Sequence, residues 1–434
     1  MKYAFMHCNL IDGKKDSPLQ KDMTVLVDGD KIEAIQPGTQ EISGDYYKKI
    51  DLKDRYLLPG LINMHAHLFG SGKPSKILAG SGQVLQNFVI DTTGRKLGGS
   101  ILDDIVAKNV ESSLNAGITT VRGVGDFHYS DVRTRDKINS GKIMGPRLIV
   151  SGPALTVTGG HGDGTFAVTA DNPWDFRKLV RKNVMANVDL IKICVTSGVM
   201  DAQKRGEPAL RMTVEETKAV CDEAHMNGYM VASHTESYAG VVVALEGGVD
   251  TIEHGSHLDE KTINLFKKNG SSMTCTISPA IPLVKLSPDQ TKLSPMSDYN
   301  SKIVLNGIID GAKDALANEI PVGLGTDSSC PFVTQYDMWR ELYYFQKIIG
   351  VSAAFAIYTA TLRNAQLMRI GNETGSIEVG KCADLIVVDK NPLEDLSALR
   401  DVTLVMARGN LIEHPTVQKN PYIEKQLDEM MKTL

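Results

Sequence analysis

The feature that most constrains the fold is a regular alternation of apolar runs and helix-like segments between residues 60 and 375. Strands of a parallel sheet covered on both faces are near-continuous apolar runs, and helices connect them. The alternation therefore predicts an α/β fold with a parallel sheet. The strand-like runs are Leu57–Leu68, Gly117–Val124, Arg147–Leu155, Asp189–Val195, Tyr229–Ser233, Val249–Glu253, Ser272–Ile277 and Pro321–Gly325.

The segments between these runs carry helix signals. Thr213 followed by Glu216 is a capping box ahead of the helical segment Thr217–Asn227, and Gly228 ends it. Eight strands alternating with helices predict a (β/α)8 TIM barrel. A doubly wound open sheet is the alternative, but no GxGxxG sequence follows the first strand, which counts against it.

Both chain ends show strand patterns outside this region. Met23–Val27 and Lys31–Ile35 flank an Asp-Gly turn, a hairpin signal, and Ala383–Val388 and Val402–Met406 are strand-like. Neither end alone has enough strands for a stable sheet. We therefore predict a small composite β-sandwich domain, with two independent hairpins as the alternative. The predicted domains are 1–59 and 376–434 for the two parts of the β domain, the latter with a tail helix, and 60–375 for the barrel.

Composition narrows the function classes. The chain has 434 residues, and its net charge of −5 without a basic run argues against a nucleic-acid partner. No stretch approaches the roughly 18 apolar residues that span a bilayer, and no secretory signal is visible. Six scattered cysteines without CxxC favour reduced thiols. We expect a cytoplasmic enzyme with a small-molecule substrate, no nucleic-acid or membrane partner, and a homo-oligomeric assembly.

Polar residues interrupt or close several of the predicted strands. His65 and His67 are at positions i and i+2 of the first strand, share one face, and can grip one metal ion. Lys192 lies between isoleucines, where a free ammonium is costly unless it is paired or chemically changed.

Three further strands end in a polar residue, at the face where barrel active sites lie: His234, His254 and Asp327. Each of these residues taken singly is more often structural than functional. Their convergence with the histidine pair and the buried lysine on five strands predicts a metal centre.

This pattern resembles the amidohydrolase superfamily, whose metal signature is His-x-His on strand one, Lys on strand four, His on strands five and six, and Asp on strand eight. The resemblance covers the whole chain. The segments Gly117–Arg122, Thr158–Asp163, Ile191–Ile193 and Ile252–Gly255 are similar to the imidazolonepropionase-related branch, which contains metal-dependent Xaa-Pro dipeptidases of the prolidase-like type.

The resemblance implies two divalent metal ions, and histidine with carboxylate ligands suits Zn²⁺. It also implies that Lys192 carries a CO2-derived carbamate that bridges the two ions. The implied ligands are His65, His67 and Asp327 for the first ion, and His234 and His254 for the second.

The resemblance also implies catalytic roles. A hydroxide shared by the ions would attack the scissile carbonyl, with Asp327 as general base and then acid. His161, on a glycine-rich loop after the third strand, would hydrogen-bond the substrate carbonyl or its oxyanion. A hydrogen bond from His161 to local backbone is the alternative.

Three residues are candidates for substrate binding. Arg211 could clamp a carboxylate bidentately, or be a solvated surface arginine. Arg122 ends the second strand and could point into the barrel mouth, or form a structural ion pair. Glu236 shares a face with His234 and could receive an ammonium, or cap a neighbouring segment. The second strand ends Arg122-Gly123 where the branch often has Arg-Asp.

The predicted function is hydrolysis of the amide bond of a dipeptide, such as one of the Xaa-Pro type, or of an N-acyl amino acid. The alternative is hydrolysis of cyclic amides, lactones, carbamates or small xenobiotic amides. Mononuclear relatives such as imidazolonepropionase lack the lysine of strand four, so Lys192 counts against a mononuclear site. A non-catalytic scaffold on this fold would have lost metal ligands, and all six are present.

Overall fold

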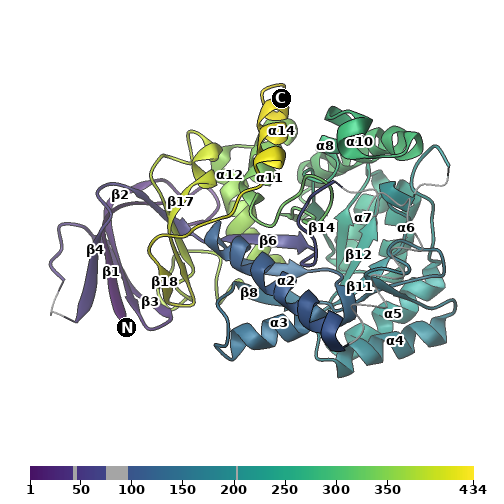
Figure 1. Cartoon of the computed structure of the whole chain (residues 1–434), viewed down its shortest axis with the longest axis horizontal. Coiled ribbons are helices and arrows are strands. Elements are labelled where there is room, and N and C mark those ends of the chain that lie inside the picture. The colour runs from purple at the N-terminus through teal and green to yellow at the C-terminus, as the bar shows by residue number, and fades with distance from the viewer. Residues whose placement is uncertain (43–45, 75–95, 202–203) are drawn as a thin grey trace.

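The computed structural model describes residues 1–42, 46–74, 96–201 and 204–434. Its larger part is built on two parallel ladders of strands surrounded by helices (Figure 1). The first ladder contains β6 (Leu61–Ala66), β7 (Ile118–Gly123) and β8 (Arg147–Val150). The second runs in the order β10 (Ala167–Thr169), β9 (Ala154–Thr156), β11 (Ile191–Cys194), β12 (Val231–Thr235), β13 (Thr251–His254), β14 (Ser272–Cys275) and β15 (Val322–Leu324).

Hydrogen bonds at both seams join the two ladders into a closed barrel. At one seam the Asp327 N–H donates to the His65 carbonyl at 2.8 Å, and Ala66 forms a parallel bridge with Ser328. At the other, the Asp189 N–H donates to the Val150 carbonyl at 2.7 Å. The predicted TIM barrel is confirmed, and the open-sheet alternative is excluded. Each of the eight predicted strand-like runs contains a strand of the barrel wall.

The helices around the barrel begin and end at residues that the sequence marks. The capping box of Thr213 and Glu216 opens α5 (Val214–Met226). A second box, from Asp259, opens α7 (Glu260–Asn269), which ends at Gly270 in the left-handed region at φ 67°. The other helices are α2 (Lys96–Asn115), α3 (Ser130–Asn139), α4 (Pro173–Met185), α6 (Tyr238–Gly247), α8 (Ile281–Lys285), α9 (Pro288–Thr291), α10 (Pro295–Ala317), α11 (Met338–Tyr344), α12 (Ala353–Tyr358) and α13 (Asn364–Leu367).

Both chain ends contribute to one further sheet. Its order is β18 (Asn410–Ile412), β17 (Val402–Ala407), β16 (Leu385–Val388), β5 (Tyr56–Pro59), β1 (Lys2–Leu10), β2 (Gln20–Asp28) and β3 (Lys31–Pro37), and β4 (Tyr47–Asp51) also pairs with β1. The two ends meet where β5 pairs with β16, with Leu57 opposite Val387. The composite domain is therefore confirmed, and two independent hairpins are excluded.

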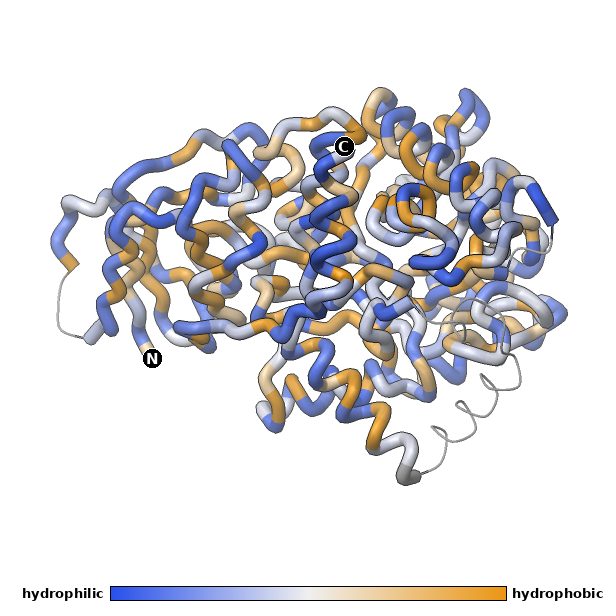
Figure 2. The backbone as a smooth tube through the Cα atoms, turned by 45° about the horizontal axis from the view of Figure 1, so that its top comes forward, coloured by the Kyte–Doolittle hydropathy of each residue, from blue (hydrophilic) through white to orange (hydrophobic). Residues whose placement is uncertain are grey.

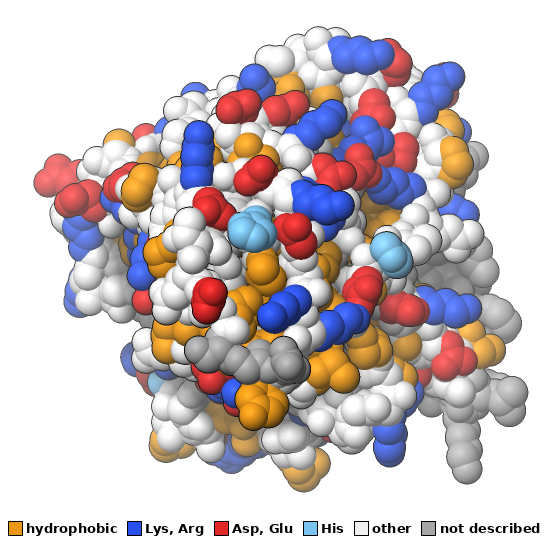
Figure 3. All heavy atoms as spheres, turned by 90° about the vertical axis from the view of Figure 1, so that its left-hand side faces the viewer, with side chains coloured by type: hydrophobic (Ala, Val, Ile, Leu, Met, Phe, Trp, Pro, Cys, Tyr) orange, Lys and Arg blue, Asp and Glu red, His pale blue; other side chains and the backbone are white. Residues whose placement is uncertain are grey.

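This composite sheet folds back on itself around an apolar core. The Ile32 N–H donates to the Lys381 carbonyl at 2.9 Å, so β3 returns to the chain just before β16. Phe5, Val27 and Leu404 lie in the same buried cluster between the two halves. Acidic and basic side chains are interspersed over the end of the molecule that carries this domain (Figure 3).

The last helix, α14 (Pro421–Met431), packs on the barrel. Arg340 of α11 forms ion pairs with Glu424 at 3.0 Å and with Asp428 at 2.8 Å.

Short hydrophobic and hydrophilic stretches alternate along the whole chain (Figure 2), as expected for helices and strands that bury one face. Within the described ranges, no helix combines the length and apolar content that crossing a bilayer requires.

Barrel closure at the first seam depends on a residue without a side chain. A Cβ on Gly325 would lie 2.4 Å from the Cβ of His65 and 2.5 Å from its backbone nitrogen. Because both atoms belong to a neighbouring strand, β6 would have to shift. We expect Gly325→Ala to lower the free energy of unfolding by about 1–3 kcal/mol in urea denaturation.

Gly123→Ala is the matched control, because a Cβ there meets nothing closer than 3.8 Å and Gly123 has an ordinary negative-φ backbone. Equal losses of stability in the two variants would show that the seam does not restrict residue 325.

Candidate active site

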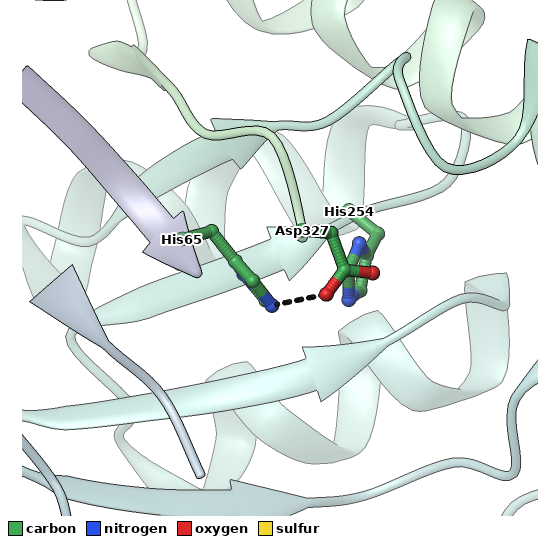
Figure 4. A group of neighbouring side chains, drawn as sticks. All are labelled: His65, His254 and Asp327. Atoms are coloured by element: carbon green, nitrogen blue, oxygen red, sulfur yellow. Dashed lines mark ion pairs between the residues drawn. The ribbon is translucent and has the colours of Figure 1, made fainter. Parts of the chain in front are cut away.

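Three of the predicted ligands converge where the strands β6, β13 and β15 end. His65, His254 and Asp327 each offer a ligand atom, and these atoms all lie within 4.8 Å of one another. The side chains point toward a common centre (Figure 4). The Nε2 atoms of both His65 and His67 lie 3.3 Å from the Oδ1 atom of Asp327.

A second group of possible ligands shares His254 with the first. The ligand atoms of His234, Glu236 and His254 also lie within 4.8 Å of one another. The ring centroid of His254 is 4.8 Å from that of His234 and 4.7 Å from that of His65. The two groups are therefore adjacent. Glu236, which we predicted as a substrate contact or a capping residue, lies within the second group.

Lys192 points into this region from β11. The residue is 1% exposed, and its Nζ atom has no hydrogen-bond partner among the described residues. Burial lowers the pKa of its amine, and the nearby Glu253 and Asp327 carboxylates only partly oppose that effect. A lysine whose amine is buried without a partner is uncommon, because a buried polar group normally forms a hydrogen bond.

In three of the four predicted ligand rings, those of His65, His67 and His254, the protein holds the Nδ1 atom. The Nδ1 atom of His67 donates to the Gly125 carbonyl at 2.6 Å, and that of His254 is hydrogen-bonded to Thr276 at 2.7 Å. The Nδ1 atom of His65 lies 2.7 Å from the Glu253 carboxylate. Hydrogen bonds of this kind orient metal-binding imidazoles and leave Nε2 for the ion.

Several buried atoms lack hydrogen-bond partners, as a metal site requires. Four buried atoms in this region have no hydrogen-bond partner in the described part of the chain: His65 Nε2, Lys192 Nζ, Glu236 Oε2 and Asp327 Oδ1. Imidazole nitrogens and carboxylate oxygens are ligands of Zn²⁺ and similar ions. The donor set therefore fits a divalent metal.

Electrostatics favours the metal-binding form of these groups. Burial lowers the pKa of His67, and it lowers those of His234 and His254 well below the ordinary value, so these rings stay neutral. Burial alone would raise the pKa of Asp327, but His65 and His67 hold it well below its usual range. Neutral imidazoles and an ionised carboxylate are the forms that bind metal.

Glu253 has a role here that we did not predict. It is 0% exposed, and its other oxygen accepts a hydrogen bond of 2.6 Å from the guanidinium of Arg122. Burial would raise the pKa of Glu253, but Arg122 above all holds it well below its usual range. The only hint in the sequence is that Arg and Glu both interrupt apolar strands.

Arg122 lies inside the barrel. It is 2% exposed, and it also donates to the Met64 carbonyl at 2.6 Å and to Thr251 at 3.3 Å. Its donors are thus engaged by the protein. This placement favours the structural ion pair over the predicted contact with substrate.

His161 is brought to the edge of the candidate metal site. Its ring stacks on that of His234, with centroids 4.1 Å apart and planes at 15°. Its Nδ1 atom forms a hydrogen-bonded ion pair with Asp201. Burial would lower the pKa of His161, but Asp201 raises it overall. Nothing in the sequence around Asp201 marks it as a partner of this histidine.

Glu236 and Arg211 are the remaining predicted substrate contacts. The Glu236 side chain is 10% exposed, and burial raises its pKa to about 8. Arg211 is partly buried, and its charge helps His161 to lower the pKa of Asp201. The Arg211 N–H donates to the Val195 carbonyl at 2.8 Å, so Arg211 lies beside the end of β11, the strand that carries Lys192.

Aromatic rings border the site beside His67. The Phe166 ring lies 4.7 Å from that of His67, and Phe69 meets Phe127 edge to face at 4.6 Å. The three phenylalanines are partly exposed, which gives the site one apolar side.

With this geometry established, comparison with known proteins identifies the family. A sequence model of the Amidohydrolase family matches residues 56–412. The chain belongs to this family. The fold is similar to that of a candidate prolidase from Bifidobacterium longum, at 36% identity and a TM-score of 0.87 over 99% of both chains. A Xaa-Pro dipeptidase with methionine bound in its active site is 32% identical, with a TM-score of 0.83 over 95% of this chain and 100% of that one.

More distant relatives act on other substrates. Ochratoxinase of Aspergillus niger is 25% identical over 97% of this chain and 90% of its own length. Imidazolonepropionase of Caldanaerobacter subterraneus subsp. tengcongensis is 25% identical over 92% of each. The predicted superfamily and branch are confirmed, and the amidohydrolase is a hydrolase acting on carbon–nitrogen bonds.

Removing the charge of Glu253 tests its two roles, as counter-charge of Arg122 and as hydrogen-bond partner of His65. Glu253→Gln leaves the Arg122 guanidinium buried without a counter-charge, so we expect the free energy of unfolding to fall by about 3–5 kcal/mol. It also weakens the hold on His65, and metal affinity should fall about 10- to 100-fold. Urea denaturation and metal titration measure the two effects.

The double variant Arg122→Met with Glu253→Gln is the control. It should recover stability, because no lone charge remains, but it should not recover metal affinity. Full metal affinity in Glu253→Gln would contradict the role of Glu253 in orienting His65.

Proposed function

We propose that this amidohydrolase is a binuclear metal-dependent enzyme that cleaves the amide bond of a dipeptide, of the Xaa-Pro type, or of an N-acyl amino acid. The observation that carries the proposal is the set of buried ligand atoms without hydrogen-bond partners around Lys192 and Asp327. The similarity to a Xaa-Pro dipeptidase supports the choice of substrate class.

The proposed ligands would be divided between two metal ions. His65, His67 and Asp327 would hold one ion, and His234 and His254 the other. Lys192 would join them as a carbamate, formed when its neutral amine attacks CO2 and loses a proton. The lowered pKa of Lys192 supports this reaction, since only the neutral amine is nucleophilic. When bound, the ions supply an acidified water and polarise the scissile carbonyl.

The protein groups would then manage the proton and the substrate. Asp327, ionised and beside both His65 and His67, would take the proton of the attacking water and return it to the leaving nitrogen. His161 would donate from Nε2 to the carbonyl oxygen as negative charge develops there. These roles require the substrate carbonyl to lie between the metal site and His161.

Two charged residues would recognise the ends of a dipeptide. Arg211 would bind the terminal carboxylate, and Glu236 would receive the ammonium group. An N-acyl amino acid would use Arg211 alone.

A second candidate function is hydrolysis of cyclic amides, lactones, carbamates or small xenobiotic amides. The apolar flank formed by Phe69, Phe127 and Phe166 favours it, because such substrates need little charge recognition. Similarity to ochratoxinase and imidazolonepropionase also supports it.

A substrate screen distinguishes the two functions. Zinc-loaded enzyme is incubated with dipeptides and N-acyl amino acids, each paired with its C-terminal amide, and free amine is measured. We expect release from the acids, with hits that share one C-terminal residue. Hydrolysis only of cyclic amides, carbamates or esters in a parallel set, with products detected by mass spectrometry, would establish the second function instead.

The variant Arg211→Met tests the carboxylate clamp within the same screen. Loss of a charge-assisted hydrogen bond should raise KM for the acids about 10- to 100-fold and leave KM for the amides nearly unchanged. An equal rise for acids and amides would remove the proposed role of Arg211.

Substitution of Lys192 tests the bridging ligand. We expect Lys192→Ala to bind fewer metal ions per chain by atomic absorption and to lose more than about a hundredfold in turnover, since the loss of a ligand should exceed that of an outer partner. Lys192→Glu, which restores an anionic oxygen, should retain more metal than Lys192→Met.

The exposed Lys182→Ala is the matched control and should behave as wild type. Full metal content and turnover in Lys192→Ala would refute the bridging carbamate.

A further inference from the structure

A turn after β11 carries two residues that hold His161 and that the proposed mechanism does not use. Asp201 ends the short helical segment Val199–Asp201, and its Oδ2 atom is the partner of His161 Nδ1. The same oxygen accepts the backbone N–H of Gly198 at 3.3 Å. One carboxylate oxygen thus links the turn to a ring that belongs to a different loop.

Gly198 leaves space for the His161 ring because it has no side chain. A Cβ at this position would lie 2.7 Å from Cε1 and 2.8 Å from Nδ1 of His161. Gly198 does not have a left-handed backbone, so its conformation alone would permit alanine. The close approach of the imidazole is what excludes a side chain here.

His161 needs such support because of the loop that carries it. Gly159 and Gly162 on either side both have left-handed backbones, at φ 70° and 76°. Glycines allow the loop many conformations in the unfolded chain, so contacts from elsewhere must fix the ring. In the structure these contacts are His234 by stacking, Phe166 by an edge at 5.4 Å, and the turn at 198–201.

We propose that Asp201 and Gly198 form a seat that fixes the His161 ring parallel to His234 and leaves its Nε2 atom for the substrate carbonyl. Among the described residues, Nε2 of His161 has no protein hydrogen-bond partner, whereas Nδ1 is engaged by Asp201. Asp201 is therefore a positioning residue that acts through His161 and does not touch the substrate. The inference rests on the proposed function, in which His161 binds the carbonyl oxygen.

The position of the His161 ring should determine the rate of hydrolysis. A displacement of about 1 Å in a group that binds the transition state can reduce the rate about a hundredfold. A seat of this kind also acts on kcat more than on KM, because the hydrogen bond strengthens as charge develops on the oxygen.

A double-mutant cycle tests whether Asp201 acts through His161. We expect His161→Ala to lower kcat about 10²- to 10³-fold, and Asp201→Ala to lower it about 10- to 100-fold with KM changed less than threefold or so. In the His161→Ala background, Asp201→Ala should have no further effect. Gly198→Ala should follow the same pattern, because its Cβ displaces the same ring.

Two variants serve as controls. Asp201→Asn keeps an acceptor oxygen in place and should lose less activity than Asp201→Ala. Asp222→Ala removes a carboxylate of similar exposure that lies away from the site. Its partner is Lys218, at 2.7 Å, and the variant should behave as wild type. Unchanged activity in Asp201→Ala, or an equal loss with and without His161, would overturn the proposal.

A second readout does not depend on the substrate. Crystal structures of metal-loaded Asp201→Ala and Gly198→Ala should show the His161 ring turned away from its parallel contact with His234. A ring that stays at its wild-type spacing and angle in both variants would overturn the seat, whatever the enzyme hydrolyses. If the ring is displaced in both variants but the enzyme hydrolyses none of the dipeptides or N-acyl amino acids, the proposed function is refuted and the role of Asp201 and Gly198 is not.

Discussion

The carboxylate of Glu253 lies wholly inside the barrel, between the guanidinium of Arg122 and the imidazole of His65. Bringing two ions out of water costs several kcal/mol each, so the pair is tolerable only because both partners are fully hydrogen-bonded. Arg122 satisfies this condition by also contacting β6, β13 and β14, through Met64, Thr251 and Thr274. One charged pair thus ties together several strands and aims a metal-binding ring.

The strand periodicity predicted much of this arrangement. Apolar runs located the barrel strands, and polar residues at their ends located His65, His234, His254 and Asp327, because parallel strands all end at the same face of a barrel. The composite domain was predictable for a similar reason, since neither chain end could form a sheet alone.

The partners of these ligands were not predictable from the same pattern. Glu253 and His254 are adjacent, and in a regular strand adjacent side chains point to opposite faces. His254 has a left-handed backbone at φ 68°, so the alternation ends there and both side chains reach the site. Asp327 has the same conformation at φ 56°, and Asp201 meets His161 from a separate loop. Contacts that depend on single backbone dihedrals or on the meeting of two loops leave no periodic signal.

The pairing of β5 with β16 has a consequence for how the chain is made. Leu57 and Val387 are separated by the entire barrel, on the order of 300 residues of sequence. During synthesis at about 5–20 residues per second, the first strands therefore wait many seconds with one edge open before their partner leaves the ribosome. An open strand edge is a template for wrong pairing. Lys48 and Lys49 lie on β4, which pairs with β1 on the same side as β5, and they are well suited to protect this side of the nascent sheet during that interval.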